Sequence, residues 1–144
     1  MDIPLEKAVP AVLRQGNVFY FVDPSILSTD PHNYVLLSKQ PTSERKLVFV
    51  LGTSKVEKVR RYRAAQPPAT LVVVAPQDYR DFTCETMFDC NNPREIAVAD
   101  VVRFMNMEGR LKPRDHIGAS ILERLVNGVL ASPIVEERIK KEIV

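Results

Sequence analysis

Hydrophobic and polar positions along the chain predict a β-rich first half. Five short apolar runs contain many branched and aromatic residues, and turn-forming residues such as Pro, Asn, Asp and Gly bound them. The third run, KLVFVLG, is apolar at successive positions, which predicts a central strand that is covered on both faces. The expected strands are residues 17–22, 33–38, 46–52, 70–75 and 84–90.

The second half of the chain has helical periodicity instead. Its apolar residues recur three and four positions apart, as on one face of an amphipathic helix. Ser132 followed by Pro133 predicts a helix start, because serine caps helix N-termini and proline fits the first helical position. Strands first and helices last favour an α+β fold built on a small antiparallel barrel. The expected helices are residues 55–64, 98–105, 114–131 and 133–143.

Composition narrows the class of protein. The 144 residues are 45% hydrophobic and carry a net charge of +2, which suits one domain with its own core. No apolar stretch approaches the roughly 18 residues of a transmembrane helix, and the first residues lack the apolar block of a signal peptide. Two cysteines and two histidines favour free thiols over a metal site. We therefore expect a cytoplasmic protein with no membrane association, no metal and no cofactor.

Charge is concentrated in one segment of the chain. Between Lys55 and Arg63 there are five cationic residues and one glutamate, although the whole chain nets only +2. This basic segment directly follows Gly52, Thr53 and Ser54 at the end of the third strand, so hydroxyl groups lie next to cations. Such a combination suits the binding of a phosphodiester backbone. The alternative is a solvated helix face that only keeps the protein in solution.

Three motifs, taken in order, resemble the PemK/MazF family, the ribonuclease toxins of bacterial toxin–antitoxin pairs. Residues 15–23, QGNVFYFVD, are similar to the family's opening strand, and residues 32–38, HNYVLLS, stand where the family has its second strand. Residues 48–54, VFVLGTS, resemble the strand whose threonine and serine border the active site. More weakly, residues 86–91 lie where the family's fifth strand is expected.

The resemblance implies a fold and a set of partners. It implies an SH3-like barrel core in residues 14–92, whereas the helices after residue 113 are longer than the compact toxins have. We expect a single domain, residues 1–144, with a helical C-terminal part in residues 96–144. The resemblance further implies a homodimer, a single-stranded RNA substrate and an antitoxin protein as partner. Apolar residues near the C-terminus are candidates for the dimer contact. They are Ile134, Val135 and Ile139.

This chain departs from the family at positions that matter for catalysis. The opening arginine and aspartate are Gln15 and Asn17 here, and the arginine before the second strand is replaced by His32. The family uses that arginine to handle phosphate charge. Arginine does not release its proton, whereas imidazole groups exchange protons near neutral pH, so the replacement would shift the chemistry toward proton transfer. The alternative is an exposed loop histidine after Pro31, on a scaffold that has lost catalysis.

The candidate catalytic residues are His32, Thr53 and Ser54. His32 would serve as base or acid, and the two hydroxyls would donate hydrogen bonds to a phosphate or hold an attacking oxygen. The hydroxyls could equally cap the helix that starts near Lys55. If the second and third strands pair, all three side chains should converge on one concave surface.

Further polar residues are candidates for substrate binding. An acid and an amide at Asp89 and Asn91 could read a base edge or orient His32, or they could form a turn before Pro93. The leading hypothesis is thus a metal-independent endoribonuclease that leaves a cyclic phosphate. The alternative hypothesis is a catalytically inactive RNA- or protein-binding module on the same barrel. The candidate substrate-binding residues are Gln15, Asn17, Lys55, Lys58, Arg60, Arg61, Asp89 and Asn91.

Overall fold

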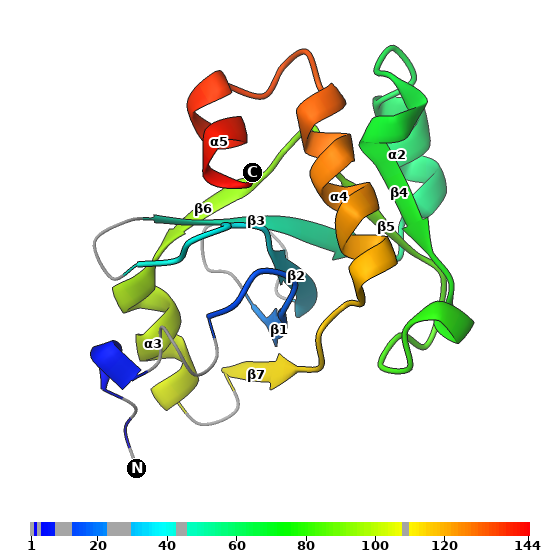
Figure 1. Cartoon of the computed structure of the whole chain (residues 1–144). Helices are drawn as coiled ribbons and strands as arrows, with labels where there is room; N and C mark the ends of the chain where they lie inside the picture. Colours follow the sequence, from blue (N-terminus) through cyan, green and yellow to red (C-terminus); the bar gives the residue numbers. More distant parts are fainter. Residues whose placement is uncertain (1, 3, 8–12, 23–29, 43–45, 108–109) are drawn as a thin grey trace.

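The described part of the chain folds into one antiparallel sheet with helices on both of its faces (Figure 1). The computed structural model describes all residues except 1, 3, 8–12, 23–29, 43–45 and 108–109. The α+β class expected from the sequence is confirmed. The strands are β1 (Val18–Phe21), β2 (His32–Leu36), β3 (Lys46–Thr53), β4 (Leu71–Val74), β5 (Thr86–Asp89), β6 (Arg94–Ala97) and β7 (Leu111–Arg114). The helices are α2 (Val56–Tyr62), α3 (Val98–Asn106), α4 (Ala119–Ala131) and α5 (Glu137–Glu142), with short 3-10 turns η1 (Pro68–Thr70) and η2 (Pro76–Asp78).

Strand β3 is the centre of the sheet. It pairs with β2 along one edge, while its other edge pairs with β6 at the start and with β5 at the end. The full strand order is β4-β5-β3-β2-β1-β7, with β6 beside β3. Within the described residues β4 and β7 do not pair with each other, so the sheet is not closed there. The closed SH3-like barrel therefore stays a prediction.

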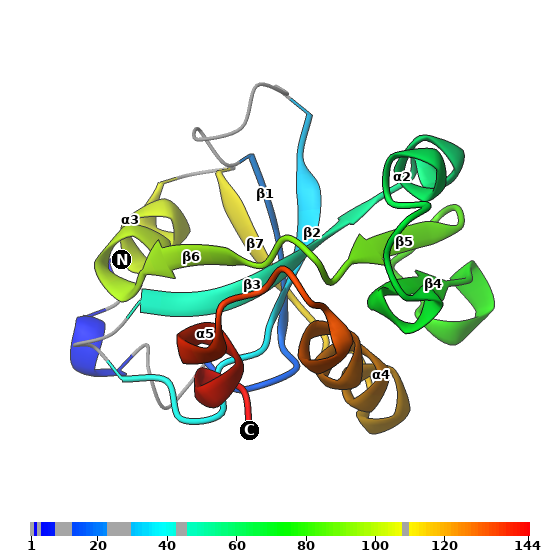
Figure 2. The same cartoon turned by 90° about the horizontal axis from the view of Figure 1, so that it is seen from above.

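Both faces of β3 are buried, as its apolar sequence predicts. Val48 and Val50 belong to a core with α4 and α5, whereas Leu47 and Phe49 belong to a second core with α3. This alternation follows from the two-residue period of a strand. Figures 1 and 2 show α4 and α5 on one side of β3 and α3 on the other. The prediction of a central strand covered on both faces is confirmed.

The five expected strands are present within two residues of their predicted bounds, but two further strands were not predicted. Strand β6 completes the edge of β3, and β7 pairs with β1. Strand β7 contains Pro113, and proline within a run argues against a strand unless it lies at a sheet edge. Strand β7 does lie at the end of the strand order. The helix expected over 114–131 consequently begins later, at Ala119.

The last helix also begins later than the sequence predicts. The structure places its start at Glu137, with Glu136 as the N-cap residue, so the expected cap at Ser132 is wrong. Ser132 is buried, and its hydroxyl donates a hydrogen bond to Asn91 Oδ1 at 2.8 Å. The same hydroxyl accepts a hydrogen bond from the Ile134 amide at 3.3 Å. Serine at this position therefore links the α4–α5 connection to the sheet rather than starting a helix.

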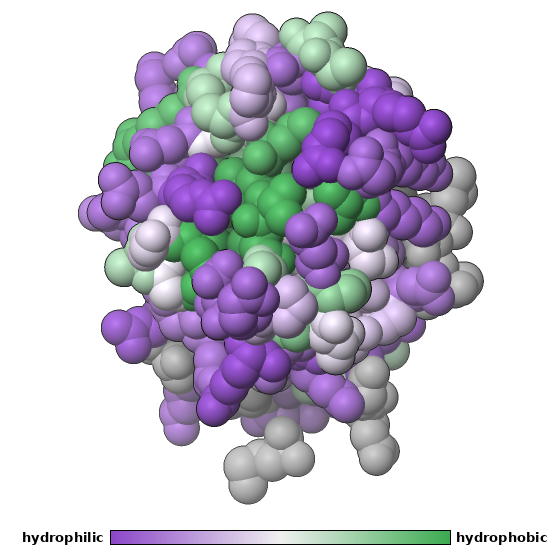
Figure 3. All heavy atoms as spheres, turned by 90° about the vertical axis from the view of Figure 1, so that its right-hand side faces the viewer, coloured by the Kyte–Doolittle hydropathy of each residue, from purple (hydrophilic) through white to green (hydrophobic). Residues whose placement is uncertain are grey.

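Two of the three candidate dimer residues are buried within the chain. Val135 and Ile139 are 7% and 8% exposed and pack in the core under α4 and α5, whereas Ile134 is 52% exposed. The prediction that all three residues form a dimer contact is therefore wrong. Apolar surface gathers instead over α2, β4 and α4, where hydrophilic residues surround it (Figure 3). Its partly exposed apolar residues on these elements include Leu71, Val73, Leu122 and Val126.

No helix in the described part of the chain combines the length and apolar character that a membrane crossing needs.

Candidate functional site

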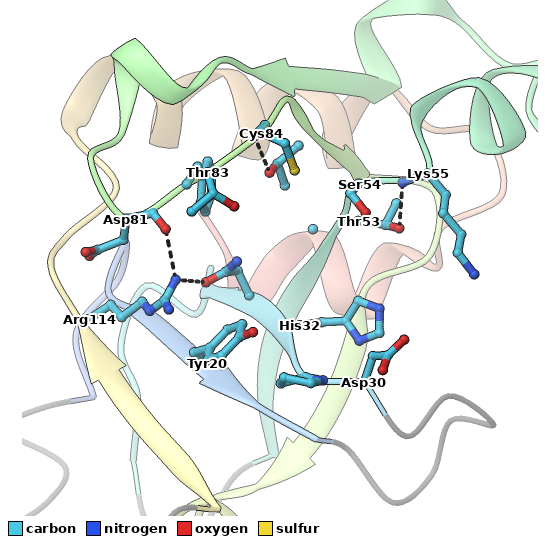
Figure 4. Close-up of a pocket in the computed structure, with 15 residues that line it drawn as sticks. Tyr20, Asp30, His32, Thr53, Ser54, Lys55, Asp81, Thr83, Cys84 and Arg114 are labelled. Carbon is cyan, nitrogen blue, oxygen red and sulfur yellow. Dashed lines mark hydrogen bonds between the residues drawn. The ribbon is translucent and has the colours of Figure 1, made fainter.

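A pocket forms where one face of the sheet changes from apolar to polar. Val18 and Val35 are paired and buried in the core, but two positions along the same strands Tyr20 pairs with Asn33. Asn33 in turn pairs with Gly52 on β3. The change leaves a cavity of about 300 Å³ at this end of the sheet (Figure 4). Its walls come from the ends of β1, β2, β3 and β7 and from the segment before β5.

Three predicted catalytic residues line this one pocket. His32 begins β2, Thr53 is the last residue of β3, where it pairs with Met87, and Ser54 follows it. Because β2 and β3 are antiparallel neighbours, the start of one strand lies beside the end of the other. The expected convergence on one concave surface is thus present in the structure. The catalytic roles of the three side chains stay predictions.

Gly52 allows the strands to approach closely under the pocket. A Cβ atom at this position would lie 2.8 Å from both the Phe88 ring and the Thr86 methyl group. Contacts that short do not occur between carbon atoms, so any larger residue would push β3 and β5 apart. The glycine of the VFVLGTS motif therefore has a packing role beside the candidate residues.

His32 is half-buried at the pocket wall and keeps one ring nitrogen unpaired. Its Nδ1 atom is buried and has no hydrogen-bond partner among the described residues. An unsatisfied buried polar atom costs about 1–3 kcal/mol. Gln66 Oε1 and Arg110 Nε are likewise buried without a hydrogen-bond partner among the described residues. The His32 imidazole is thus not committed to a protein partner through Nδ1.

The Thr53 hydroxyl forms a local turn rather than a helix cap. Its Oγ1 atom accepts a hydrogen bond from the Lys55 amide at 3.2 Å, and α2 has no side-chain cap at its N-cap residue, Lys55. The alternative reading of these hydroxyls is thus confirmed as turn chemistry at Thr53, but not as a side-chain cap of the helix. Thr53 is half-buried and Ser54 is exposed, so both hydroxyls border the open pocket.

Arg114 is the pocket residue that the sequence did not reveal. It comes from β7, whose register places it opposite Val18, and it reaches the pocket beside Tyr20 and Asn33. Its Nη1 atom donates to Asn33 Oδ1 at 2.9 Å and to the Asp81 carbonyl at 3.3 Å. Its Cζ atom lies 4.0 Å from the centre of the Tyr20 ring. No local signal marked it, because the chain segment from β1 to β7 is long and Pro113 obscured the strand.

The segment after β7 is fixed to its surroundings by hydrogen bonds. The Tyr79 hydroxyl donates to the Asp115 carbonyl at 2.8 Å, and burial together with the nearby Asp81 carboxylate raises the pKa of Tyr79 above its usual value. His116 Nδ1 accepts from the Gly118 amide at 2.9 Å. The other nitrogen of the same ring is then the one that carries hydrogen and donates to the Gln15 carbonyl at 3.1 Å. These contacts hold the end of β7 against the first strand.

Two predicted binding residues near the start of β1 lie outside the pocket lining. The Gln15 side-chain amide donates to the carbonyls of Leu37 and Ile143 at 2.9 and 3.1 Å, so it ties the first strand to the C-terminus. The backbone of Asn17 bonds to Arg14 and Leu36. The structure does not bring Gln15 or Asn17 to the candidate site. Asp23, which completes the first motif, lies outside the described residues.

Asp89 and Asn91 also lie away from the pocket, in a buried network. Asn91 Nδ2 donates to Thr70 Oγ1 at 2.9 Å and to Asp89 Oδ1 at 3.0 Å, and Arg63 Nε donates to Asp89 Oδ2 at 2.8 Å. The Asn91 amide also donates to Asp89 Oδ1 at 3.0 Å, which is the turn that the sequence left open as the alternative. These contacts join β5 to α2, η1 and the α4–α5 connection. The predicted role of Asp89 and Asn91 in reading a base edge or orienting His32 is therefore wrong.

The basic segment is divided between the pocket and an exposed helix face. Lys55 borders the pocket, and its side chain runs outward from the rim (Figure 4). Lys58, Arg60 and Arg61 are exposed on α2, and Arg60 pairs with Glu57. Arg63 is committed to Asp89. Of the predicted binding cations, only Lys55 thus lines the described pocket.

The two thiols differ in their surroundings. Cys84 is exposed and lines the pocket. Cys90 is buried, and burial, reinforced by the Asp89 charge, raises the pKa of its thiol to about 12. Among the described residues no group of three or more His, Cys, Asp or Glu side chains is placed to hold a metal ion.

Comparison with known protein families found no family model that matches this chain, and comparison with curated proteins found no match either. The resemblance to the PemK/MazF toxins thus rests on the three sequence motifs alone. What the structure adds is the pocket in which two of these motifs meet.

Proposed function

We propose that this chain is a PemK/MazF-like toxin that cleaves single-stranded RNA without a metal ion. The observation that carries the proposal is the shared pocket of His32, Thr53 and Ser54, which belong to the second and third motifs. The proposal includes the family's other properties: an SH3-like barrel, a homodimer, an antitoxin protein that neutralises the toxin, and action in the cytoplasm.

The chemistry uses the 2′-hydroxyl of the RNA as nucleophile. Its oxygen attacks the neighbouring phosphorus, the bond from phosphorus to the 5′-oxygen breaks, and a 2′,3′-cyclic phosphate forms. One proton must leave the 2′-hydroxyl and one must reach the 5′-oxygen. His32 takes part in one of these transfers, because its imidazole lines the pocket beside the two hydroxyl residues. The Thr53 and Ser54 hydroxyls donate hydrogen bonds to the phosphate oxygens.

A binding module without catalysis is the second candidate. It is favoured by Lys58 and Arg61, which are exposed on α2 and make no ion pair with a described residue. Such cations give affinity for a phosphate backbone without any reaction. In this reading His32 is a wall residue of the pocket and RNA remains whole.

The test is the pH dependence of RNA cleavage by the wild type and by His32 variants in excess chelator. We expect the wild type to cleave at a rate that depends on pH, and His32→Ala to lower the rate by about 10²–10⁴-fold with RNA affinity nearly intact. His32→Arg restores the family's residue and should retain some activity without that pH dependence. RNA that is bound yet whole from pH 5 to 9 would establish the binding module instead.

A further inference from the structure

Arg114 is a positively charged group held in place by neutral partners. The Asn33 side chain and the Asp81 backbone carbonyl accept from Nη1, and the Tyr20 ring lies under the guanidinium at 4.0 Å. These partners come from β1, β2 and the segment before β5. The side chain therefore has one fixed position in the pocket wall, and ordering it costs little when a ligand binds.

The charge of Arg114 is not neutralised within the described chain. No described carboxylate lies within ion-pair distance of it, and the Asp81 carboxylate points away from the pocket (Figure 4). Arg63 shows the contrast: it is also half-buried, but Asp89 accepts from it at 2.8 Å. Asp30 and Asp81 also line the pocket, but neither forms an ion pair with Arg114. A cation in a partly enclosed site without a carboxylate at ion-pair distance favours binding of an anion from solution.

The direction of the Arg114 side chain indicates where an anion would bind in the pocket. Among the described residues that line the pocket, one is a lysine, Lys55, and one is an arginine, Arg114. The Lys55 side chain runs outward from the rim, whereas the Arg114 guanidinium extends from β7 into the pocket, across from His32 and Thr53 (Figure 4). An anion between these walls meets the guanidinium on one side and the imidazole and hydroxyl on the other.

We infer that Arg114 binds the scissile phosphate of the RNA and is a further catalytic residue, in the place of the arginine that His32 replaces. This inference rests on the proposed function. Arg114 exchanges no proton in the reaction; its N–H groups compensate the negative charge that grows on the non-bridging oxygens as the 2′-oxygen bonds to phosphorus. Asn33, Tyr20 and the Asp81 carbonyl are positioning groups, because they fix the guanidinium before the substrate arrives.

The test compares Arg114→Gln, Arg114→Lys and the control Arg103→Gln, which removes the same charge from an exposed site on α3 where Arg103 pairs with Asp100. With single-stranded RNA in excess chelator, we expect Arg114→Gln to lower kcat by about 10²–10³-fold, the usual effect of losing one such donor. Arg114→Lys keeps the charge but not the planar fork and should fall between this variant and the wild type. Arg103→Gln should stay within about twofold of the wild type.

Binding of an uncleavable 2′-O-methyl oligonucleotide, followed by fluorescence anisotropy against salt, separates this inference from the proposed function. Arg114→Gln should reduce the log–log salt slope by about 0.7, the share of one phosphate contact on a single strand, and Arg103→Gln should not.

If the wild type does not cleave RNA, the proposed function fails, but a slope change confined to Arg114→Gln still supports the phosphate site. Equal slopes for the two glutamine variants, or kcat unchanged in Arg114→Gln, overturn the inference. If Arg114→Gln does not fold, Arg114→Lys decides through its kcat, because it keeps the charge and hence the salt slope; a wild-type kcat in that variant overturns the inference as well.

Discussion

Replacing Gly16 by alanine should destabilise the protein far more than the same change at Gly118. Both glycines have a positive φ, +91° and +97°, and a residue forced into such a sparsely populated backbone region costs about 1–3 kcal/mol. At Gly16 the new Cβ would lie 2.1 Å from His116 Nε2, so the imidazole has to move. The displaced ring loses its hydrogen bonds to the Gln15 carbonyl and from the Gly118 amide, worth about 0.5–1.5 kcal/mol each.

The expected loss in the free energy of unfolding is therefore about 2–6 kcal/mol for Gly16→Ala. At Gly118 no described atom lies within 4 Å of the Cβ position, so the loss should stay at the backbone cost of about 1–3 kcal/mol. The entropy that alanine removes from the unfolded chain is common to both variants and cancels in the comparison. Urea denaturation at constant pH measures both values. Equal losses, within about 0.5 kcal/mol, would refute the placement of His116 against the first strand.

Two other properties can be measured on the intact protein. Under native conditions a thiol reagent should modify Cys84 quickly and Cys90 only after unfolding, because burial raises the pKa of Cys90 to about 12; two fast thiols would contradict this packing. Hydrogen bonds from Arg138 lower the pKa of Glu95 below its usual 4.5, so their stabilisation is present above that pH and is lost as pH falls through the lowered pKa. Glu95→Gln should thus be less stable than the wild type at pH 7, with the gap closing toward pH 3 in denaturant titrations; a constant gap would show that another interaction is responsible.

The sheet was more predictable than the site, for physical reasons. The apolar sequence of β3 predicts burial on both faces and hence a central position, because a strand at an edge or surface would need polar residues. Strand β7 could not be predicted in the same way, since Lys112 and Pro113 give it a polar and proline-broken sequence. Its place is determined by pairing with β1, over ninety residues away along the chain in the printed sequence.

The candidate site was predictable only where it follows from neighbouring strands. His32 and Thr53 meet because β2 and β3 pair directly, and that pairing is the simplest one for consecutive strands. Arg114 depends on the long-range pairing of β7, so the sequence offered no sign of it. Asp89 and Asn91 looked like site residues because polar groups at strand ends are common in binding sites. Their buried partners, Thr70 and Ser132, are distant in sequence and became apparent only in the folded chain.

Cleavage that starts from the RNA's own 2′-hydroxyl is the central claim, and one paired measurement tests it directly. A single-stranded RNA and its fully 2′-O-methylated counterpart are incubated with the wild-type chain in excess chelator, and the products and their ends are mapped. We expect the RNA to be cut with 2′,3′-cyclic phosphate ends, while the methylated strand is bound but stays whole, because it lacks the proton that must leave the nucleophile. Uncut RNA, or equal cutting of both strands, would contradict the account.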